Sequence, residues 1–260
     1  MQATQSRLVT HFRVLHALLV REMITRYGKT SAGYLWALIE PVGVIILLTA
    51  LFTQIAHAPP YGQSFALFYA TGYVAFHWVM DISSVAARSV HVNRPLLAFS
   101  RVSALDTVLA RFLLQSLTGI AVGSLILSSL LIWSDGASDF SPGPAMQAFC
   151  LACLLALGIG LVNCWAFTVS RGWEIAWGVL SRPLLLISCV FYSFEGLPAL
   201  GRDLLWYNPI VHIVGLVREA VYPTYDPAHL SVSYVTAIAL ALIIVGLWSM
   251  RVIRARMAFG

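Results

Sequence analysis

The sequence predicts an all-helical integral membrane protein, and three observations support this prediction. Of its 260 residues, 59% are hydrophobic and 10% are charged, and the mean hydropathy of +0.82 lies well above the usual range of soluble domains. Six continuous apolar stretches are each long enough to cross about 30 Å of hydrocarbon as a helix. These stretches lack the polar alternation of membrane β-strands, which favours a helical bundle.

The six stretches define a transmembrane domain that we expect at residues 34–260, preceded by a cytoplasmic segment at residues 1–33. Each stretch is rich in Leu, Ile, Val, Ala and Phe, as expected for a helix surrounded by lipid. The expected spans are Tyr34–Ala56, Ala66–Ala87, Phe112–Trp133, Ala145–Val169, Trp173–Phe194 and Val232–Val252.

The distribution of basic residues predicts the orientation of the chain, because cytoplasmic connections carry an excess of Lys and Arg. Counting along the six stretches places all but Arg202 and Arg218 of the 16 basic residues on the side of the two termini. We therefore expect both termini to be cytoplasmic. The net charge of +5 then reflects topology and contact with anionic lipid, and we expect no nucleic-acid partner.

The segment before the first stretch has the pattern of an amphipathic helix. Its apolar residues recur at spacings of three and four, which places them on one helical face opposite the basic residues. We expect this helix to lie along the cytoplasmic surface of the membrane. The apolar face comprises Leu8, Phe12, Leu15, Leu19 and Met23, and the opposite face carries Arg7, Arg13 and Arg21.

Two of the connections between stretches differ from simple turns. Residues 89–106 are short, basic and moderately apolar, with Pro95 as a helix breaker and Ser103 as a helix cap, so they can present a small helix to a cytoplasmic partner. Residues 195–231 contain two apolar segments that are too short to span, separated by Asn208-Pro209. We expect two short helices there that enter the outer leaflet.

Charged residues within the apolar stretches are candidate functional positions, because burying a charge in lipid is costly. Glu40 precedes Pro41 and is expected in the first turn of its helix, where the helix dipole favours a carboxylate. Asp81 and Arg88 are expected on one helical face, either as an ion pair or along a transport pathway. Arg182 interrupts the fifth stretch and either extends to the interface or faces an anion pathway.

Catalytic motifs are not evident in the sequence. The Gly-Lys-Thr of residues 28–30 matches the end of a phosphate-binding loop, but Met23 replaces the earlier glycine and no strand precedes it. The HExxH and GxSxG motifs do not occur. Cys150 and Cys153 form a CxxC motif inside an apolar stretch, where packing explains them better than metal binding. We therefore expect a non-catalytic chain that binds no metal.

Several short motifs occur in a characteristic order along nearly the whole chain. They are Arg21-Glu22, Arg26-Tyr27-Gly28, Gly33-Tyr34-Leu35-Trp36 and Glu40-Pro41; Asn93, Leu96-Leu97, Leu105-Asp106 and Arg111; Arg182-Pro183-Leu184 and Ser188; and Leu197-Pro198, Tyr207-Asn208-Pro209, His212 and Arg218. With these residues the chain resembles the transmembrane subunit of an ABC-2 type polysaccharide exporter, most closely the capsular polysaccharide permease of the KpsM type. One departure is Cys189, where the family pattern has glycine.

The resemblance implies a homodimer of six-span subunits in the bacterial inner membrane, together with two copies of a separate cytoplasmic ABC ATPase. The permease would bind no cofactor, since ATP and Mg belong to the ATPase. In such exporters the N-terminal helix acts as a gate, the loop at residues 89–106 couples to the ATPase, and the two external helices shape the exit. Periplasmic and outer-membrane export proteins would continue the route.

The expected cargo, an acidic glycan on a phospholipid anchor, suggests three groups of site residues, because arginine binds anionic groups and aromatic rings contact sugar faces. The substrate path comprises Arg21, Arg26, Lys29, Arg88, Arg182, Tyr27, Tyr34, Trp36, Trp173 and Trp177. The ATPase-coupling residues are Asn93, Arg94, Leu96, Leu97, Arg101 and Asp106. The external gate consists of Tyr207, Asn208, Pro209, His212 and Arg218.

Three alternatives remain open at the level of sequence. The same architecture could export O-antigen or teichoic acid instead of capsule. An ion-coupled secondary transporter would need a carboxylate or sodium site near mid-membrane, and the candidates Glu40 and Asp81 lie near the cytoplasmic ends of their stretches. An intramembrane lipid-modifying enzyme would need clustered His, Asp, Ser or Arg at one depth, and no such cluster is evident.

Overall fold

The computed structural model describes residues 2–27, 33–55, 57–97, 102–134 and 140–259, with side chains for all of these except 2–12, 26–27, 33–34 and 252–259. All regular secondary structure in this part of the chain is helical, as predicted. The described helices are α1 (Gln2–Tyr27), α2 (Gly33–Phe52), α3 (Phe65–Ala87), α4 (Ser89–Val92), α5 (Arg94–Leu97), α6 (Ala104–Trp133), α7 (Pro142–Val169), α8 (Arg171–Ile187), α9 (Ala199–Leu205), α10 (Pro209–Val221) and α11 (Val232–Phe259).

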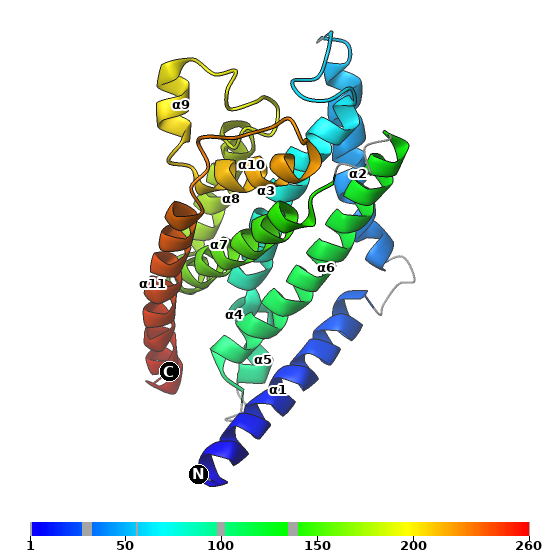
Figure 1. Cartoon of the computed structure of the whole chain (residues 1–260). Helices are drawn as coiled ribbons and strands as arrows, with labels where there is room; N and C mark the ends of the chain where they lie inside the picture. The colour runs from blue at the N-terminus through cyan, green and yellow to red at the C-terminus, as the bar shows by residue number, and fades with distance from the viewer. Residues whose placement is uncertain (1, 28–32, 56, 98–101, 135–139, 260) are drawn as a thin grey trace.

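The long helices lie side by side in a bundle whose central member is α7. This helix packs extensively against α11 and α3 and also against α10, whereas α1 lies along α6 at one edge of the bundle. Figure 1 shows the start of α1 and the end of α11 at one end of the bundle and α9 at the other. Both termini therefore lie on the same side, as the distribution of basic residues predicts.

Glycines allow α7 to approach its neighbours closely. A Cβ added at Gly160 would lie 2.6 Å from Ala86 Cβ of α3, and one added at Gly158 would lie 2.8 Å from Leu242 Cβ of α11. On the opposing helix, a Cβ at Gly246 would lie 2.5 Å from a side-chain atom of α7. Lipid tails are as apolar as the side chains, so membrane helices associate mainly through close packing of this kind.

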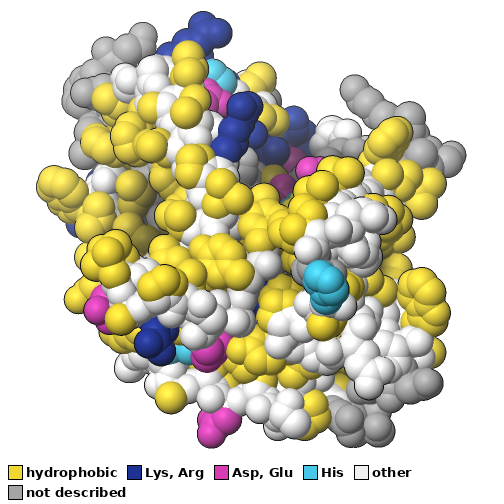
Figure 2. Space-filling view, turned by 90° about the horizontal axis from the view of Figure 1, so that it is seen from above, with side chains coloured by type: hydrophobic (Ala, Val, Ile, Leu, Met, Phe, Trp, Pro, Cys, Tyr) yellow, Lys and Arg dark blue, Asp and Glu magenta, His cyan; other side chains and the backbone are white. Residues whose placement is uncertain are grey.

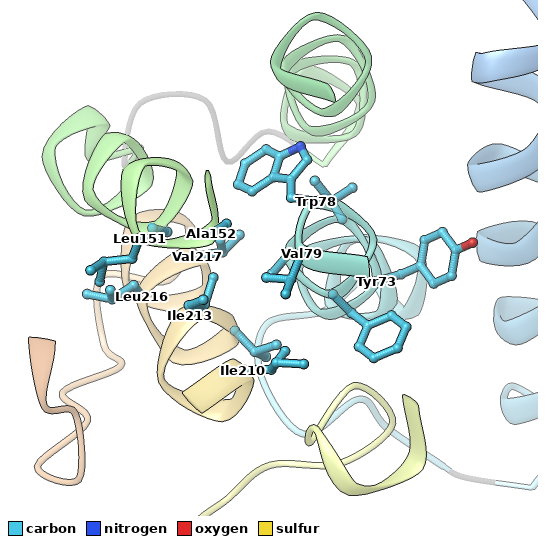
Figure 3. Packing of buried hydrophobic residues seen from close by; sticks show 14 of the residues in the cluster. Tyr73, Trp78, Val79, Leu151, Ala152, Ile210, Ile213, Leu216 and Val217 are labelled. Carbon is cyan, nitrogen blue, oxygen red and sulfur yellow. The ribbon is translucent and has the colours of Figure 1, made fainter. Parts of the chain in front are cut away.

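The main apolar core lies where α3, α7 and α10 meet. Figure 3 shows Val79 of α3, Ala152 of α7 and Ile213 of α10 facing the same interior space, and all three are fully buried. Trp78 extends from α3 to α6, where its indole N–H donates a hydrogen bond to Gly119 O at 2.8 Å. Because α10 is too short to span a membrane, its burial against α3 and α7 is what holds it inside the bundle.

Four of the described helices are long and apolar enough to cross a membrane: α2 over Leu35–Phe52, α6 over Ala104–Trp133, α7 over Pro142–Val169 and α11 over Val232–Arg251. They correspond to the first, third, fourth and sixth predicted spans. The second and fifth predicted spans form α3 and α8, which are not among these four. Helix α8 has 17 residues and ends at Ile187, earlier than the predicted end at Phe194.

Helix α8 ends early because the backbone reverses after Ser188. Cys189 has a φ of 57°, which lies in the left-handed region of backbone conformation. Glycine adopts this region freely, whereas a residue with a side chain loses about 1 kcal/mol of conformational energy there. Glycine was the expected residue at this position, and in this chain cysteine adopts the left-handed conformation at the turn that follows α8.

A buried arginine of α10 holds this turn. Arg218 is 1% exposed, and its guanidinium donates hydrogen bonds to Tyr192 O at 3.1 Å, Cys189 O at 2.8 Å and Val190 O at 3.2 Å. Its charge also lies 4.3 Å from the centre of the Phe68 ring of α3. The carbonyls beyond a helix end have no partner within the helix, so a cation there stabilises them. Arg218 therefore joins α3, α10 and the end of α8.

The close packing of α7 yields the first prediction. Replacing Gly160→Ala would force a Cβ against Ala86, and we expect the purified chain to lose about 1–3 kcal/mol of stability, measured as a lower melting temperature in detergent. The matched control is Gly178→Ala in α8, where an added Cβ meets nothing within 4 Å. Equal melting temperatures for the two variants would contradict the packing.

Candidate functional site

A buried polar contact attaches α1 to the bundle. We call it the Asn93 cluster, and it consists of Arg21, Glu22, Asn93 and Arg111. The Asn93 side chain is 1% exposed. It accepts a hydrogen bond from Arg21 Nη1 at 2.9 Å and donates one to Glu22 Oε1 at 3.0 Å. One amide between α4 and α5 thus contacts two consecutive residues of α1, which fixes both the position and the rotation of that helix.

Charge pairing makes this contact stable. Glu22 is 6% exposed, and a buried carboxylate needs a nearby cation because desolvation of its charge is costly. Arg111 of α6 provides that cation, with its Nε 3.6 Å from Glu22 Oε2. Arg111 Nη1 also donates a hydrogen bond to Arg88 O at 3.3 Å, so the cluster extends to the end of α3. Helices α1, α3, α4 and α6 therefore meet at one buried ion pair.

The expected coupling segment forms α4, α5 and the start of α6. Ser103 caps α6 as predicted: its Oγ accepts a hydrogen bond from Asp106 N at 3.2 Å, and Asp106 Oδ2 accepts one from Ser103 N at 2.9 Å. Both Asp106 and Asn93 are buried and therefore support the fold of this segment.

Other members of the coupling segment are accessible to a partner. Arg94 is exposed, and so are His91 and Val92 on the preceding helix. Leu96 and Leu97 are half-buried, and Arg101 lies outside the described residues. The accessible part of the segment therefore carries basic and apolar side chains, directly beside the buried Asn93.

As far as the structure describes them, the side chains expected along the substrate path belong to several helices: Arg21 to α1, Trp36 to α2, Arg88 to the end of α3, and Trp173, Trp177 and Arg182 to α8. Trp36 of α2 and Arg182 of α8 are both exposed. Trp173 donates a hydrogen bond from its indole to Asn163 Oδ1 at 3.0 Å, and its ring lies 6.4 Å from that of Trp177. Lys29 lies outside the described residues, as do the side chains of Arg26, Tyr27 and Tyr34.

One of the two alternatives for Asp81 and Arg88, the ion pair, is wrong, and so is the expected position of Glu40. Asp81 and Arg88 do not pair: Asp81 accepts a hydrogen bond from Gln115, whereas Arg88 Nε contacts Glu174 Oε1 of α8 at 3.2 Å. The reason is that partners on neighbouring helices lie closer than the residue two turns along α3. Glu40 is not in the first turn of its helix, because α2 begins at Gly33 and continues through Pro41.

The expected external gate residues largely support the fold. Asn208 caps α10 by accepting a hydrogen bond from Ile210 N at 3.0 Å, and its Nδ2 donates to Ile187 O and Ser188 Oγ at the end of α8, each at 3.0 Å. Pro209 begins α10, where its missing N–H has no cost. These residues therefore fix the start of α10 against the end of α8.

His212 is fully buried, and its hydrogen bonds define its tautomer. The backbone N–H of Ser231 donates to His212 Nδ1 at 3.2 Å, so Nδ1 must be the acceptor. The proton then resides on Nε2, which lies 2.8 Å from Trp206 O. A neutral imidazole thus connects the segment after α9 to the segment before α11. Tyr207 in contrast is 68% exposed.

A second polar contact, the Glu195 cluster (Tyr61, Glu195, Tyr225 and His229), lies beyond the end of α8. Tyr61 and Tyr225 donate hydrogen bonds to the two Glu195 oxygens at 2.6 and 3.1 Å, and His229 Nδ1 lies 3.3 Å from Oε1. Burial alone would raise the pKa of Glu195, but the contacts with His229 and Tyr61 outweigh it and lower that pKa to about 2. Three separate segments are therefore joined through one ionised carboxylate.

Sequence reasoning assigned no role to Glu22, Arg111 or Glu195. Glu22 is the one acidic residue of the basic segment before the first span, and that isolation was a usable signal. No comparable signal marks Glu195, because its partner Tyr61 is 134 residues away. Among the described residues, no group of three or more His, Cys, Asp or Glu side chains is placed to hold a metal ion.

The four candidate spans, the central α7 and the buried polar contacts at both ends define a multi-span helical membrane protein. Comparison with known proteins gives the family: the profile of the ABC-2 type transporter matches residues 13–222. The chain therefore belongs to the ABC-2 type transporter family, as the sequence motifs predict. It is accordingly a membrane permease subunit rather than an enzyme.

Individual relatives resemble the chain over most of its length. The polysialic acid transport protein KpsM of Escherichia coli is 32% identical over 236 residues, which cover 90% of each chain. The capsule polysaccharide export inner-membrane proteins BexB of Haemophilus influenzae and CtrC of Neisseria meningitidis serogroup B are 28% and 29% identical, each covering 90% of this chain and 89% of their own.

The lowered pKa of Glu195 yields a prediction about acid sensitivity. A group whose pKa falls from 4.5 to about 2 on folding stabilises the protein above pH 4.5, and this contribution is lost as the pH decreases from 4.5 towards 2. We expect Glu195→Gln to remove this contribution to the pH dependence of stability. Unfolding of the purified chain between pH 4.5 and 2 is followed by tryptophan fluorescence. The exposed residue Asp226 provides the control, and an Asp226→Asn variant with the same loss of pH dependence would contradict the assignment.

Proposed function

We propose that this chain is the inner-membrane permease subunit of an ATP-driven exporter of capsular polysaccharide. The observation that carries the proposal is the similarity to KpsM, BexB and CtrC along 90% of the chain, since these relatives are named for polysialic acid transport and capsule polysaccharide export. The Asn93 cluster supports it, because it connects a segment accessible to an ATPase with the N-terminal helix.

The proposed topology has six crossings, with α3 and α8 added to the four candidate spans, and with α9 and α10 as re-entrant external helices. Burial supports this arrangement for α3, which packs inside the bundle, and for α10, which is enclosed by α3 and α7. Residues 1–33 form the gate segment, of which α1 is the helix, and both termini are cytoplasmic.

A second copy of the chain completes the transport path in this proposal. Helix α8 has no buried residues, and its exposed apolar side chains include Ile175, Val179 and Leu186. On α2, Ile46 and Leu47 are similarly exposed. These faces suit a homodimer in which α8 and α2 of the two copies enclose the path. Arg182 of α8 then faces the passing cargo from each copy.

Transport begins at the positive inner rim of the dimer. The anionic phosphate and sugar groups of a lipid-linked acidic glycan are attracted by Arg21, Arg26 and Lys29, and then by Arg88 and Arg182. Exposed aromatic rings such as that of Trp36 provide flat contacts along which sugar rings can move. Two ATPase subunits bind ATP and Mg, and periplasmic and outer-membrane export proteins receive the polymer.

The Asn93 cluster provides a physical route for coupling. ATP binding moves the exposed face of α4 and α5, and the Asn93 amide carries that movement to Arg21 and Glu22 of α1. Helix α1 then shifts at the membrane surface and opens the inner side of the path. A two-state helix position of this kind is a common element of transport switches.

Deleting the gene in its host and restoring it from a plasmid tests the proposed function. We expect deletion to remove surface capsule while polymer accumulates in the cytoplasm, and restoration to reverse both effects. Loss of O-antigen or teichoic acid with normal capsule would assign a different cargo to the same architecture. Solute transport by the chain alone, driven by an ion gradient, would contradict the proposal.

Coupling through Asn93 yields a specific prediction. Asn93→Ala removes the hydrogen bonds to both α1 residues, so we expect ATP hydrolysis by the assembled complex to continue while surface polymer falls by about tenfold or more. The matched control is His91→Ala, an exposed neighbour on α4. Normal export by the Asn93→Ala variant would exclude this route.

The position of Arg182 yields a further prediction. Arg182→Ala leaves the fold intact because the side chain is exposed, and we expect it to abolish surface polymer without affecting assembly with the ATPase. Arg182→Lys keeps the positive charge and should retain part of the export. Both surface polymer and copurified ATPase are measured. Full export by Arg182→Ala would remove this residue from the path.

A further inference from the structure

A hollow of about 420 Å³ lies beside α9, at the end of the bundle opposite to the termini. Its walls are Phe194, Arg202, Asp203, Trp206 and Tyr207, and we call it the α9 hollow. Figure 2 looks onto this end of the molecule, where charged side chains occur in small groups between hydrophobic ones. The hollow therefore combines three aromatic rings with one cation and one anion, a composition unlike that of the lipid-facing helices.

Neighbouring groups orient the aromatic walls of the hollow, Trp206 and Phe194 more closely than the exposed Tyr207. Trp206 donates its indole N–H to His229 O at 3.0 Å, and its ring packs 4.7 Å from that of Tyr234. Tyr207 stands at 89° to the Trp206 ring, with the ring centres 5.5 Å apart. Phe194 stacks on His229 at 4.0 Å. A ligand would meet the rings of Trp206 and Phe194 already in place, so little of their conformational entropy is lost on binding.

The two charged residues of the hollow are available to a ligand. Arg202 and Asp203 are both exposed, and neither has a side-chain hydrogen bond or ion pair with any other residue that the structure describes. Tyr207, which is 68% exposed, presents its ring beside them. Sugars offer apolar C–H faces for aromatic rings and hydroxyls for charged groups, and an acidic sugar adds a carboxylate that pairs with arginine.

We propose that the α9 hollow is a binding site for sugar rings of an acidic glycan on the external side of the membrane. The proposal rests on the proposed export function and adds a specific contact for the polymer as it leaves the path. The ring of Tyr207 contacts one face of a sugar, Arg202 binds its carboxylate, and Asp203 accepts hydrogen bonds from hydroxyls. The aromatic walls favour a sugar ring over an anionic lipid headgroup, because a headgroup phosphate offers no apolar C–H face for them to contact.

Binding to defined oligosaccharides tests the proposal. The purified full chain in nanodiscs is titrated with a hexasaccharide of alternating glucuronic acid and N-acetylglucosamine, and with the same hexasaccharide after its carboxylates are reduced to alcohols. Saturation-transfer NMR reports binding. We expect the acidic form to bind more tightly, Tyr207→Ala to weaken binding of both forms about fivefold, and Arg202→Gln to remove the preference for the acidic form.

The matched control is Leu200→Ala, a 73% exposed residue of α9 that does not line the hollow, and its affinity should stay within about twofold of the unmodified chain. The proposal is overturned if the unmodified chain binds neither oligosaccharide, if Arg202→Gln retains the acidic preference, or if Leu200→Ala weakens binding as much as Tyr207→Ala. Anionic nanodisc lipid competing with both oligosaccharides would assign the hollow to headgroups and overturn it too.

Surface capsule in the complemented deletion strain separates the two proposals. If the unmodified chain restores capsule but Tyr207→Ala and Arg202→Gln bind the oligosaccharides like the unmodified chain, the proposed glycan site is wrong and the export function stands. If the unmodified chain fails to restore capsule, the export function itself is wrong, whatever the oligosaccharides do.

Discussion

The hydrogen bonds of the Asn93 side chain set the relation between α1 and the rest of the bundle. Asn93 lies between two short helices, is almost fully buried, and contacts Arg21 and Glu22 with opposite ends of its amide. Glu22 is buried as well, so Arg111 of α6 is needed to compensate its negative charge. Removing one member of the cluster would leave a buried charge without a partner, which is costly. This makes α1 a positioned helix rather than a segment that merely rests on lipid.

The other end of the bundle is organised by a different buried cation. Arg218 binds the carbonyls after α8, while Asn208 joins the same helix end to the start of α10. Between the two ends, α7 packs through Gly158 and Gly160 against helices on both sides. The polar contacts therefore lie at the ends of the bundle, whereas the close-packed glycines lie within α7 itself, so an end can rearrange while α7 remains packed.

The sequence predicts most helices well because continuous apolar stretches leave few alternatives in a membrane. It also predicts the cap at Ser103, which depends on residues three apart.

The sequence does not predict the Asn93 cluster, because Asn93 and Glu22 are separated by 71 residues and neither pattern nor spacing connects them. The early end of α8 was missed because Cys189 is not a residue that normally marks a left-handed turn. Arg218 was expected at an external gate, and its burial against backbone carbonyls shows that it also supports the fold.

The central claim is that α1 and the turn between α4 and α5 move together, and a distance measurement tests it most directly. Spin labels are attached at Met23→Cys and Val92→Cys, which are 43% and 55% exposed, in a chain with Cys150 and Cys153 replaced by serine and assembled with its ATPase. Pulsed electron paramagnetic resonance then gives the distance distribution with and without ATP. The account predicts one narrow distribution that is the same in both states and that broadens when Asn93 is replaced by alanine. A distance that changes on ATP binding while Asn93 is intact would contradict it.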